Sequence, residues 1–415
     1  MATEKLFQKD VYLKEADLKV CAVRENKGKI QVVFESTIFF PEGGGQPCDT
    51  GKAGGIAVTD VKDEKETGLV WHTVDIKAEE GADLANGIAP FEMGAVVRAE
   101  LDWEKRFDHM QMHCGEHVLS GVFYNLFKVE NHGFHMGEDY MTIDMAAEDG
   151  TPITEEMVRA AELACNKVIW ENVPVTTVWF DTREEANSMP VRKQIKFDED
   201  ISVVFVGDKA DPIDCCACCG THPSTTGQIG VVTIMKAESY KGMTRITLKA
   251  GRYAYLELAK RAKIASNLAQ KYSCDVSLIE ERIAAAEAKN DEIRRELGEL
   301  KTAILKSEEE KLRAALAAEQ KHFAVFRYSM QSADDLQTLA RKAEDAFTSV
   351  AALYSEKDHS VVLASCGTPA AGQLVKEYAK MYGGKGGGTP KVARAIFSKA
   401  EDAELFMDLI EKHLR

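Results

Sequence analysis

The 415-residue sequence lacks any run of about 18 apolar residues, the length that a membrane-spanning helix requires. Its first residues, MATEKLFQKDVYLKEADLK, also lack the apolar segment of a secretory signal. Low-complexity linkers and internal repeats are absent too. We therefore expect a cytoplasmic protein without a membrane partner. Its length predicts two to four domains, since an ordinary domain has about 150 residues.

The sequence also lacks an excess of basic residues. It contains 52 Lys and Arg and 67 Asp and Glu, which gives a net charge of −15. Phosphate binding requires positive charge, so this composition argues against general affinity for nucleic acid but allows a local basic surface. Basic residues gather in two groups, for which ordinary solvated surface is the alternative: Arg192, Lys193 and Lys196, and Lys236, Lys241, Arg245, Lys249, Arg252, Lys260, Arg261 and Lys263.

The ten cysteines do not suggest disulfide bonds, since disulfides are rare in chains without a secretory signal. Six of them are scattered. The other four lie together at Cys215, Cys216, Cys218 and Cys219, which favours thiol or metal chemistry.

The pattern of apolar residues predicts an α+β multidomain protein. Alternating runs around an Asn-Lys-Gly turn predict a hairpin at 19–37, within a small β-rich domain over 1–92. Residues 103–127 predict a helix with Asp102 as N-cap. A second α+β domain covers 93–252, with a helix at 155–172 and strands at 201–207 and 228–239.

Residues 253–320 are predicted to form a long helical linker. Its apolar positions repeat every three and four residues, which is a heptad seam with one polar member: Ile279, Ile283, Ala286, Asn290, Ile293, Leu297, Leu300 and Ile304. The seam predicts either a coiled-coil dimer or an antiparallel helical hairpin with Ala254–Tyr272. Strand and helix patterns then alternate in a C-terminal α/β domain over 321–415.

Two segments carry metal-binding residue types. His109, His113 and His117 are spaced by four residues along one helix face, so two imidazoles can reach one ion. Cys218 and His222 form a C-x3-H pair, and two His with a Cys and a His suit zinc. The alternatives are chance spacing, a buried cysteine cluster, and other ligands from the two interleaved C-x2-C pairs that include Cys215, Cys216 and Cys219.

HCGEH at 113–117 also fits the H-x-x-E-H signature of zinc peptidases, with Glu116 as general base. That interpretation requires an acidic third ligand and explains neither glycine-rich segment. PEGGGQP and GGKGGG are either ordinary turns or places where backbone N–H groups approach phosphate or ribose. GGKGGG lacks the spacing of a nucleoside triphosphate loop.

Four motifs occur in one order along the chain: FFPEGGGQPCDTG, RFDHMQMHCGEH, CCGTHPSTTGQIG and GGKGGGTPKVARA. Together they resemble the free-standing alanyl-tRNA editing proteins of the long form. The resemblance implies a glycine-rich β-barrel, a zinc-bearing editing domain, a coiled-coil-like linker and a C-terminal DHHA1-type domain. It also implies one zinc ion per chain, with His113, His117, Cys218 and His222 as ligands.

The resemblance implies further site residues. Thr37 would recognise the substrate hydroxyl, and Gly44, Gly45, Gln46 and His135 would line the substrate pocket. His113, His117 and Thr37 would be the catalytic set. We expect the tRNA contacts to come from Lys249, Arg252, Lys385, Gly386 and Gly387. Two positions depart from the family pattern, because Cys114 replaces its usual threonine and Cys219 replaces a glycine.

The function so implied is trans-editing, the hydrolysis of the ester that joins serine or glycine to the 3′ end of tRNA(Ala). In an intact alanyl-tRNA synthetase the aminoacylation machinery precedes this region, whereas here the barrel motif begins near Met1. We therefore expect the protein to hydrolyse aminoacyl-tRNA without aminoacylating tRNA. Zinc would either activate water or position the substrate. The alternative is a non-catalytic, zinc-stabilised tRNA-binding module. A homodimer through the linker and C-terminal domain is also expected.

Overall fold

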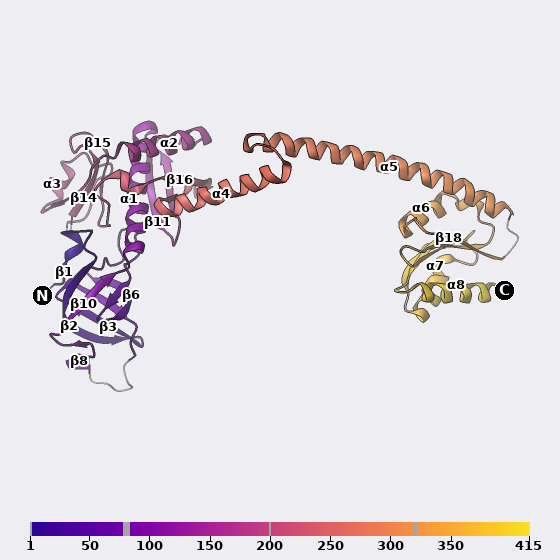
Figure 1. Cartoon of the computed structure of the whole chain (residues 1–415), viewed down its shortest axis with the longest axis horizontal. Helices are drawn as coiled ribbons and strands as arrows, with labels where there is room; N and C mark the ends of the chain where they lie inside the picture. The colour runs from indigo at the N-terminus through magenta and orange to yellow at the C-terminus, as the bar shows by residue number, and fades with distance from the viewer. Residues whose placement is uncertain (1, 78–83, 199–200, 319–321) are drawn as a thin grey trace. The chain divides into compact units, whose positions relative to one another are not determined.

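The computed structural model describes residues 2–77, 84–198, 201–318 and 322–415 and divides into two compact units, Met1–Asn267 and Leu268–Arg415 (Figure 1). Among the described residues, no helix combines the length and apolarity that crossing a membrane requires.

The first unit begins with a closed six-stranded barrel, in the order β10-β2-β3-β7-β6-β5. Its strands are β2 Glu15–Asn26, β3 Lys29–Phe34, β5 Gly51–Ala53, β6 Ile56–Glu64, β7 Leu69–Val74 and β10 Val96–Leu101. The predicted hairpin is confirmed, and its turn places Lys27 and Gly28 at φ of 52° and 76°. Because β10 closes the barrel, the barrel extends past residue 92.

Two short pairs accompany the barrel: β1 Glu4–Lys5 with β4 Ser36–Thr37, and β8 Gly87–Ile88 with β9 Phe91–Glu92. The barrel interior is filled by inward apolar side chains, among them Leu18, Val32, Phe34, Phe39 and Val58. Short 3₁₀ helices lie at Leu6–Gln8, Leu84–Asn86, Thr226–Ile229, Val276–Leu278, Glu344–Ala346 and Ala379–Tyr382.

The long helix α1, Trp103–Phe127, follows the barrel directly and has the predicted bounds. The Asp102 side chain accepts a hydrogen bond from the Lys105 backbone N–H at 3.2 Å, so the predicted N-cap is confirmed. Most of α1 beyond its first turn is buried, since it packs on α2 (Glu155–Glu171) and on two sheets.

The first of these sheets has four antiparallel strands in the order β11-β12-β17-β16: β11 Val129–Met136, β12 Met141–Ala147, β16 Val232–Tyr240 and β17 Met243–Ala250. The second has three: β13 Val175–Phe180, β14 Ile201–Gly207 and β15 Pro212–Ala217, with α3 Arg183–Asn187 beside it. The helix predicted at 155–172 and the strands predicted at 201–207 and 228–239 are thereby confirmed within a few residues. Helix α4, Gly251–Tyr272, continues from β17.

The second unit begins within the C-terminal end of α4 and contains α5, Ile279–Ala318, and a five-stranded sheet in the order β18-β19-β20-β22-β21. The strands are β18 Phe323–Tyr328, β19 Val350–Ser355, β20 Ser360–Ala364, β21 Lys385–Gly388 and β22 Val392–Ile396, and the helices are α6 Ala333–Lys342, α7 Ala371–Tyr378 and α8 Ala400–Leu414. The GGKGGG segment is therefore mostly an exposed edge strand.

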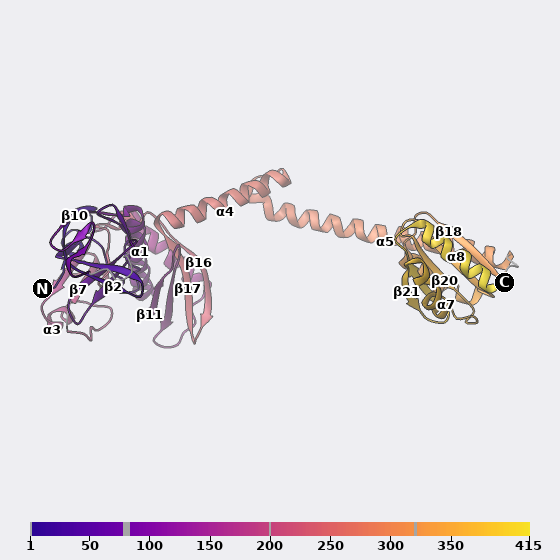
Figure 2. The ribbon, with the colours of Figure 1, turned by 90° about the horizontal axis from the view of Figure 1, so that it is seen from below.

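Alternation along the strands of this sheet gives it two apolar faces. Ala352 and Tyr354 pack with α7 and α8, whereas Ala351 and Leu353 pack with α6 and the end of α5. Figure 1 shows α6 on one side of the sheet and α7 and α8 on the other, and Figure 2 shows α7 and α8 beside each other on the same face. The predicted heptad residues of the middle of α5 face solvent, with Leu297 and Leu300 more than 60% exposed.

Candidate metal centre and its cavity

Helix α1 brings two histidines together. His113 and His117 are one helical turn apart, so both imidazoles project from the same face. Their ring centroids lie 5.4 Å apart with an interplanar angle of 27°, and each residue is only 2% exposed. His109, one turn earlier, is buried but is not part of the cluster, and burial lowers its pKa to about 4.

Cys218 and His222 approach these histidines from the segment after β15. The Cys218 Sγ lies 3.3 Å from the His113 Nε2 and 3.6 Å from the His222 Nε2. The candidate ligand atoms of all four residues lie within 4.8 Å of one another. A tetrahedral zinc ion with ordinary bond lengths would separate a sulfur and a nitrogen ligand by about 3.5 Å, so the donor set fits.

His117 gives a second indication of a metal site. Its Nδ1–H donates to the Asp214 Oδ2 at 2.8 Å, whereas its Nε2 is buried with no hydrogen-bond partner among the described residues. Buried polar atoms are nearly always satisfied, so this nitrogen is free to bind an ion. A carboxylate behind a ligating imidazole is the usual arrangement in metal sites, because it fixes the tautomer.

Asp214 is itself held by Arg192. The Arg192 Nε donates to the Asp214 Oδ1 at 2.8 Å, and both side chains are largely buried. Burial by itself raises the pKa of Asp214, but Arg192 and His117 outweigh it and hold the pKa below its ordinary value. Arg192, predicted as part of a basic surface, is therefore a structural support of the cluster.

The Cys218 thiol is activated by its surroundings. Burial by itself would raise its pKa, but His113 and His222 lower the pKa well below its ordinary value. The thiolate is the form that binds metal. Burial lowers the pKa of His222 to about 4, so its imidazole is neutral at physiological pH, as ligation requires.

Gln46 holds His113 in place, as Asp214 holds His117. Its Oε1 accepts hydrogen bonds from the His113 Nδ1 at 2.9 Å and from the Thr221 N–H at 3.0 Å, and its Nε2 donates to the Thr221 Oγ1 at 2.9 Å. Gln46 was predicted to contact substrate. It is instead fully buried and orients a candidate ligand.

Two glycines allow this close packing. A Cβ at Gly220 would lie 2.3 Å from the His113 ring, and a Cβ at Gly45 would lie 2.6 Å from the Phe134 ring. Phe134 stacks on His113, with centroids 5.1 Å apart. Both Gly44 and Gly45 were expected to line the substrate pocket. Gly44 lines the cavity described below, whereas Gly45 leaves room for the Phe134 ring.

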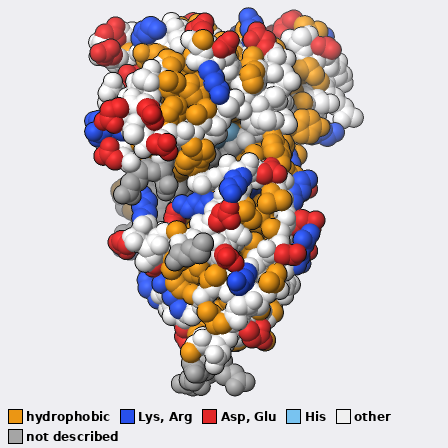
Figure 3. Space-filling model, turned by 90° about the vertical axis from the view of Figure 1, so that its left-hand side faces the viewer, with side chains coloured by type: hydrophobic (Ala, Val, Ile, Leu, Met, Phe, Trp, Pro, Cys, Tyr) orange, Lys and Arg blue, Asp and Glu red, His pale blue; other side chains and the backbone are white. Residues whose placement is uncertain are grey.

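A cavity of about 910 Å³ opens beside the cluster. Barrel residues form one wall and the three-stranded sheet contributes another, whereas α1 and β11 supply His113, Glu116, His117, Asn131 and Phe134. Figure 3 shows histidine at the floor of a hollow on this face, with hydrophobic side chains close to it and both basic and acidic side chains further out. The size is that of a small-molecule site.

Two predicted substrate residues are not in the cavity lining. Thr37 is fully buried, with its Oγ1 2.7 Å from the His72 Nε2 and 3.1 Å from the Phe39 N–H that donates to it. His135 alternates to the exposed side of β11, opposite its neighbour Phe134. The structure therefore brings neither residue to the cluster.

The remaining cysteines of interest have separate positions. Cys114 and Cys215 are core residues, and burial raises the pKa of each to about 12. Burial also raises the pKa of Cys216, to about 11, and this residue lines the cavity. Cys219 places its Sγ against the glycine-rich loop at Gly43 and Gly44. None of the four belongs to the candidate ligand set.

Glu116 does not fit the peptidase interpretation. Its Oε1 accepts hydrogen bonds from the Ser120 hydroxyl at 2.6 Å and from the Asn131 Nδ2 at 2.7 Å. Among the residues that the structure describes, no acidic third ligand of the kind that a zinc peptidase requires joins the cluster, whose other members are Cys218 and His222.

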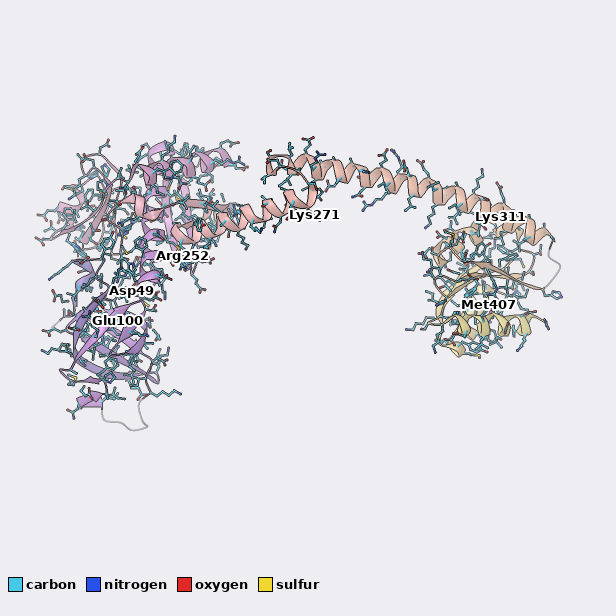
Figure 4. The ribbon with its side chains drawn as sticks, in the orientation of Figure 1. Asp49, Glu100, Arg252, Lys271, Lys311 and Met407 are labelled. Carbon is cyan, nitrogen blue, oxygen red and sulfur yellow. The ribbon has the colours of Figure 1, made fainter. Side chains whose placement is uncertain are left out.

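The predicted tRNA-binding residues of the first unit form ion pairs. Lys249 contacts Asp139 at 2.8 Å and Glu257 at 3.6 Å, and Arg252, at the start of α4 (Figure 4), pairs with Asp108. These acidic partners neutralise much of the expected basic surface. Lys385, Gly386 and Gly387 are exposed on β21.

Comparison with known proteins agrees with this geometry. Residues 201–247 match the family described as the threonyl and alanyl tRNA synthetase second additional domain. The chain is 30% identical to the alanyl-tRNA editing protein AlaX-L of Pyrococcus horikoshii, over 99% of this chain and 98% of that protein.

It is also similar to larger proteins. Identity is 29% to the alanine–tRNA ligase of Pyrococcus furiosus and 28% to that of Lactococcus lactis, and the chain spans 43% and 45% of their lengths. The match to AlaX-L, by contrast, runs through both proteins almost from end to end. The chain belongs to the family of alanyl-tRNA editing proteins.

Proposed function

We propose that this protein is a trans-editing hydrolase that deacylates tRNA(Ala) mischarged with serine or glycine. The observation that carries the proposal is the cluster of His113, His117, Cys218 and His222, the first three of which line a 910 Å³ cavity. Membership in the editing family adds the substrate class. The cavity is large enough for an aminoacyl group with its adenosine.

Zinc is the proposed metal, because one thiolate and three imidazoles are its usual donors. When bound, it would supply Lewis-acid polarisation of an ester carbonyl or of water. Gln46 and Asp214 fix the orientation of His113 and His117 through hydrogen bonds to Nδ1, which leaves each Nε2 for the metal.

Glu116 and Asn131 are the proposed partners for the serine hydroxyl, in place of Thr37. Both line the cavity beside the cluster. The two hydrogen bonds of Glu116 reach Oε1, so Oε2 remains an acceptor without a partner among the described residues. An alanyl or a glycyl group would leave this acceptor unpaired, and such a mismatch can favour the seryl ester by about 10⁴-fold.

For tRNA binding, we propose that β21 of the second unit contributes. Lys385 has no ion pair within the described part of the chain, and Gly386 and Gly387 expose the backbone of an edge strand. Exposed N–H groups and an unpaired lysine suit phosphate. Lys249 and Arg252 would contribute only by exchanging their acidic partners for phosphate.

A homodimer is proposed through the exposed heptad residues of α5. Leucine and isoleucine at this spacing bury their side chains when a second helix packs against them. Ile293, Leu297, Leu300 and Ile304 are each at least 51% exposed in the single chain.

The proposed function is tested by incubating the protein with Ser-tRNA(Ala), Gly-tRNA(Ala) and Ala-tRNA(Ala). We expect deacylation of the first or second but not the third, and loss of both activity and bound zinc in His113→Ala. His132→Ala, an exposed histidine on β11, is the matched control. Binding of tRNA without any deacylation would instead identify a non-catalytic module.

A further inference from the structure

Two large aromatic side chains lie exposed in the cavity lining. Trp179, on β13, is 40% exposed, and Phe197, in the segment after α3, is 50% exposed. Neither residue belongs to the metal cluster. Leaving such side chains in water is unfavourable, so a pair of them in one cavity indicates a binding surface.

The same cavity contains two lysines whose ammonium groups are available to a ligand. Lys65 and Lys193 line it and form no ion pair within the described ranges. The lining also contains four acidic residues. Asp63 and Asp198 are paired with Lys5 at 2.7 Å and with Arg183 at 3.3 Å, and Glu116 and Glu42 are the other two. Flat apolar rings next to free cations are what unpaired nucleotides require, because bases stack and phosphates need counter-charge.

We propose that Trp179 and Phe197 form a stacking platform for the unpaired 3′-terminal bases of the RNA, with Lys193 and Lys65 contacting the adjacent phosphates. This inference rests on the proposed function and adds the residues that hold the nucleotide part of the substrate. It separates two tasks within one cavity: the cluster side receives the ester, and the platform receives the bases.

The platform is tested by binding, without any chemistry. The probe is an unacylated single-stranded RNA oligonucleotide that ends in CCA, titrated by fluorescence anisotropy into the full chain. Base stacking on an aromatic ring contributes about five- to 150-fold in affinity, so Trp179→Ala and Phe197→Ala should each weaken binding by about tenfold or more. Trp179→Phe should retain most of the affinity, because it keeps a stacking ring.

The matched control is Trp170→Ala, since Trp170 is 64% exposed on α2 and lies outside the cavity lining. Equal weakening by Trp170→Ala and Trp179→Ala, or no weakening by Trp179→Ala and Phe197→Ala, would overturn the platform. Lys193→Ala should reduce the slope of log affinity against log salt by about 0.7, the value for one phosphate contact on a single strand.

Kinetics distinguish failure of this inference from failure of the proposed function. If wild-type protein deacylates mischarged tRNA, Trp179→Ala should raise KM about tenfold and leave kcat nearly unchanged, because the ring contacts the base and not the ester. An unchanged KM would overturn the platform and leave the hydrolase standing. An inactive wild-type protein that binds CCA through Trp179 would overturn the hydrolase alone.

Discussion

The Oε1 of Gln46 lies 2.9 Å from the Nδ1 of His113, and the two residues belong to different parts of the first unit. Gln46 comes from the glycine-rich loop after the short strand β4, whereas His113 lies in the middle of α1. The same oxygen also binds the Thr221 N–H, next to the candidate ligand His222. One amide thus ties the loop, the helix and the C-x3-H segment together.

Replacing Gln46 by Leu should therefore weaken metal binding. The shape of the side chain is roughly kept, but His113 loses the partner that fixes its tautomer, and such outer partners contribute about 10- to 100-fold to metal affinity. The measurement is zinc affinity by competition with a chromophoric chelator. Gln31→Leu is the control, because Gln31 is also buried and bonded, to Thr73, but lies away from the cluster. Equal zinc affinity in Gln46→Leu and wild type would contradict this role.

The buried ion pair between Arg106 and Asp49 should be essential for joining the barrel to α1. Arg106 is fully buried, its Nε donates to both Asp49 oxygens at 2.9 Å, and its other nitrogens donate to the Val11 and Ile38 carbonyls. Asp49, labelled in Figure 4, also accepts from the Phe40 N–H at 2.6 Å. Asp49→Ala leaves a buried guanidinium unpaired, which should cost about 3–5 kcal/mol of unfolding free energy.

Urea denaturation measures that loss. The control is Arg98→Ala, which removes the exposed pairs of Arg98 with Glu15 and Asp17 and should produce no measurable change. If both variants unfold at the wild-type urea concentration, the buried pair does not stabilise the fold.

Local spacing explains which parts of the site could be predicted from the sequence. The helix at 103–127, its Asp102 cap and the pairing of His113 with His117 depend on residues within one or two turns. Asp214 was missed, although a carboxylate directly before the cysteine-rich segment was an available signal. Its contact with His117 spans 97 positions, and no local pattern records such a distance.

The expected basic surface was overestimated for the same reason. Lys249 and Arg252 are close together in sequence, but their partners Asp139 and Asp108 lie 110 and 144 positions away. A count of the charges along one segment of sequence leaves out acidic partners that lie so far away in the chain. Thr37 was placed by resemblance, and the burial that removes it from the cavity depends on packing inside the barrel against His72.

His72 should make stability depend on pH. Burial lowers its pKa to about 4, from 6.5 in an exposed histidine. As pH falls below about 6.5 the unfolded chain binds this proton while the folded chain does not, so stability declines by up to about 1.4 kcal/mol per pH unit until the folded pKa is reached. Urea denaturation at pH 7, 6 and 5 measures the slope. His72→Asn should reduce it, and His135→Asn, an exposed control, should not.

The heptad residues of α5 give the last prediction. If two copies associate through this face, replacing both Leu297 and Leu300 by Glu should convert a dimer into a monomer, because four carboxylates would have to be buried per interface. Both leucines are more than 60% exposed in the single chain, so the substitutions should leave its own fold intact. Light scattering gives the mass, and circular dichroism checks the helix content.

The matched control is Arg295→Glu, an exposed position on α5 outside the heptad positions, which should remain dimeric. A wild-type chain that scatters as a monomer at micromolar concentration would contradict the dimer directly. A double variant that stays dimeric would show that association uses another surface. In that case the apolar face of α5 would require a different explanation, since isolated exposed leucines are common but eight residues at heptad spacing are not.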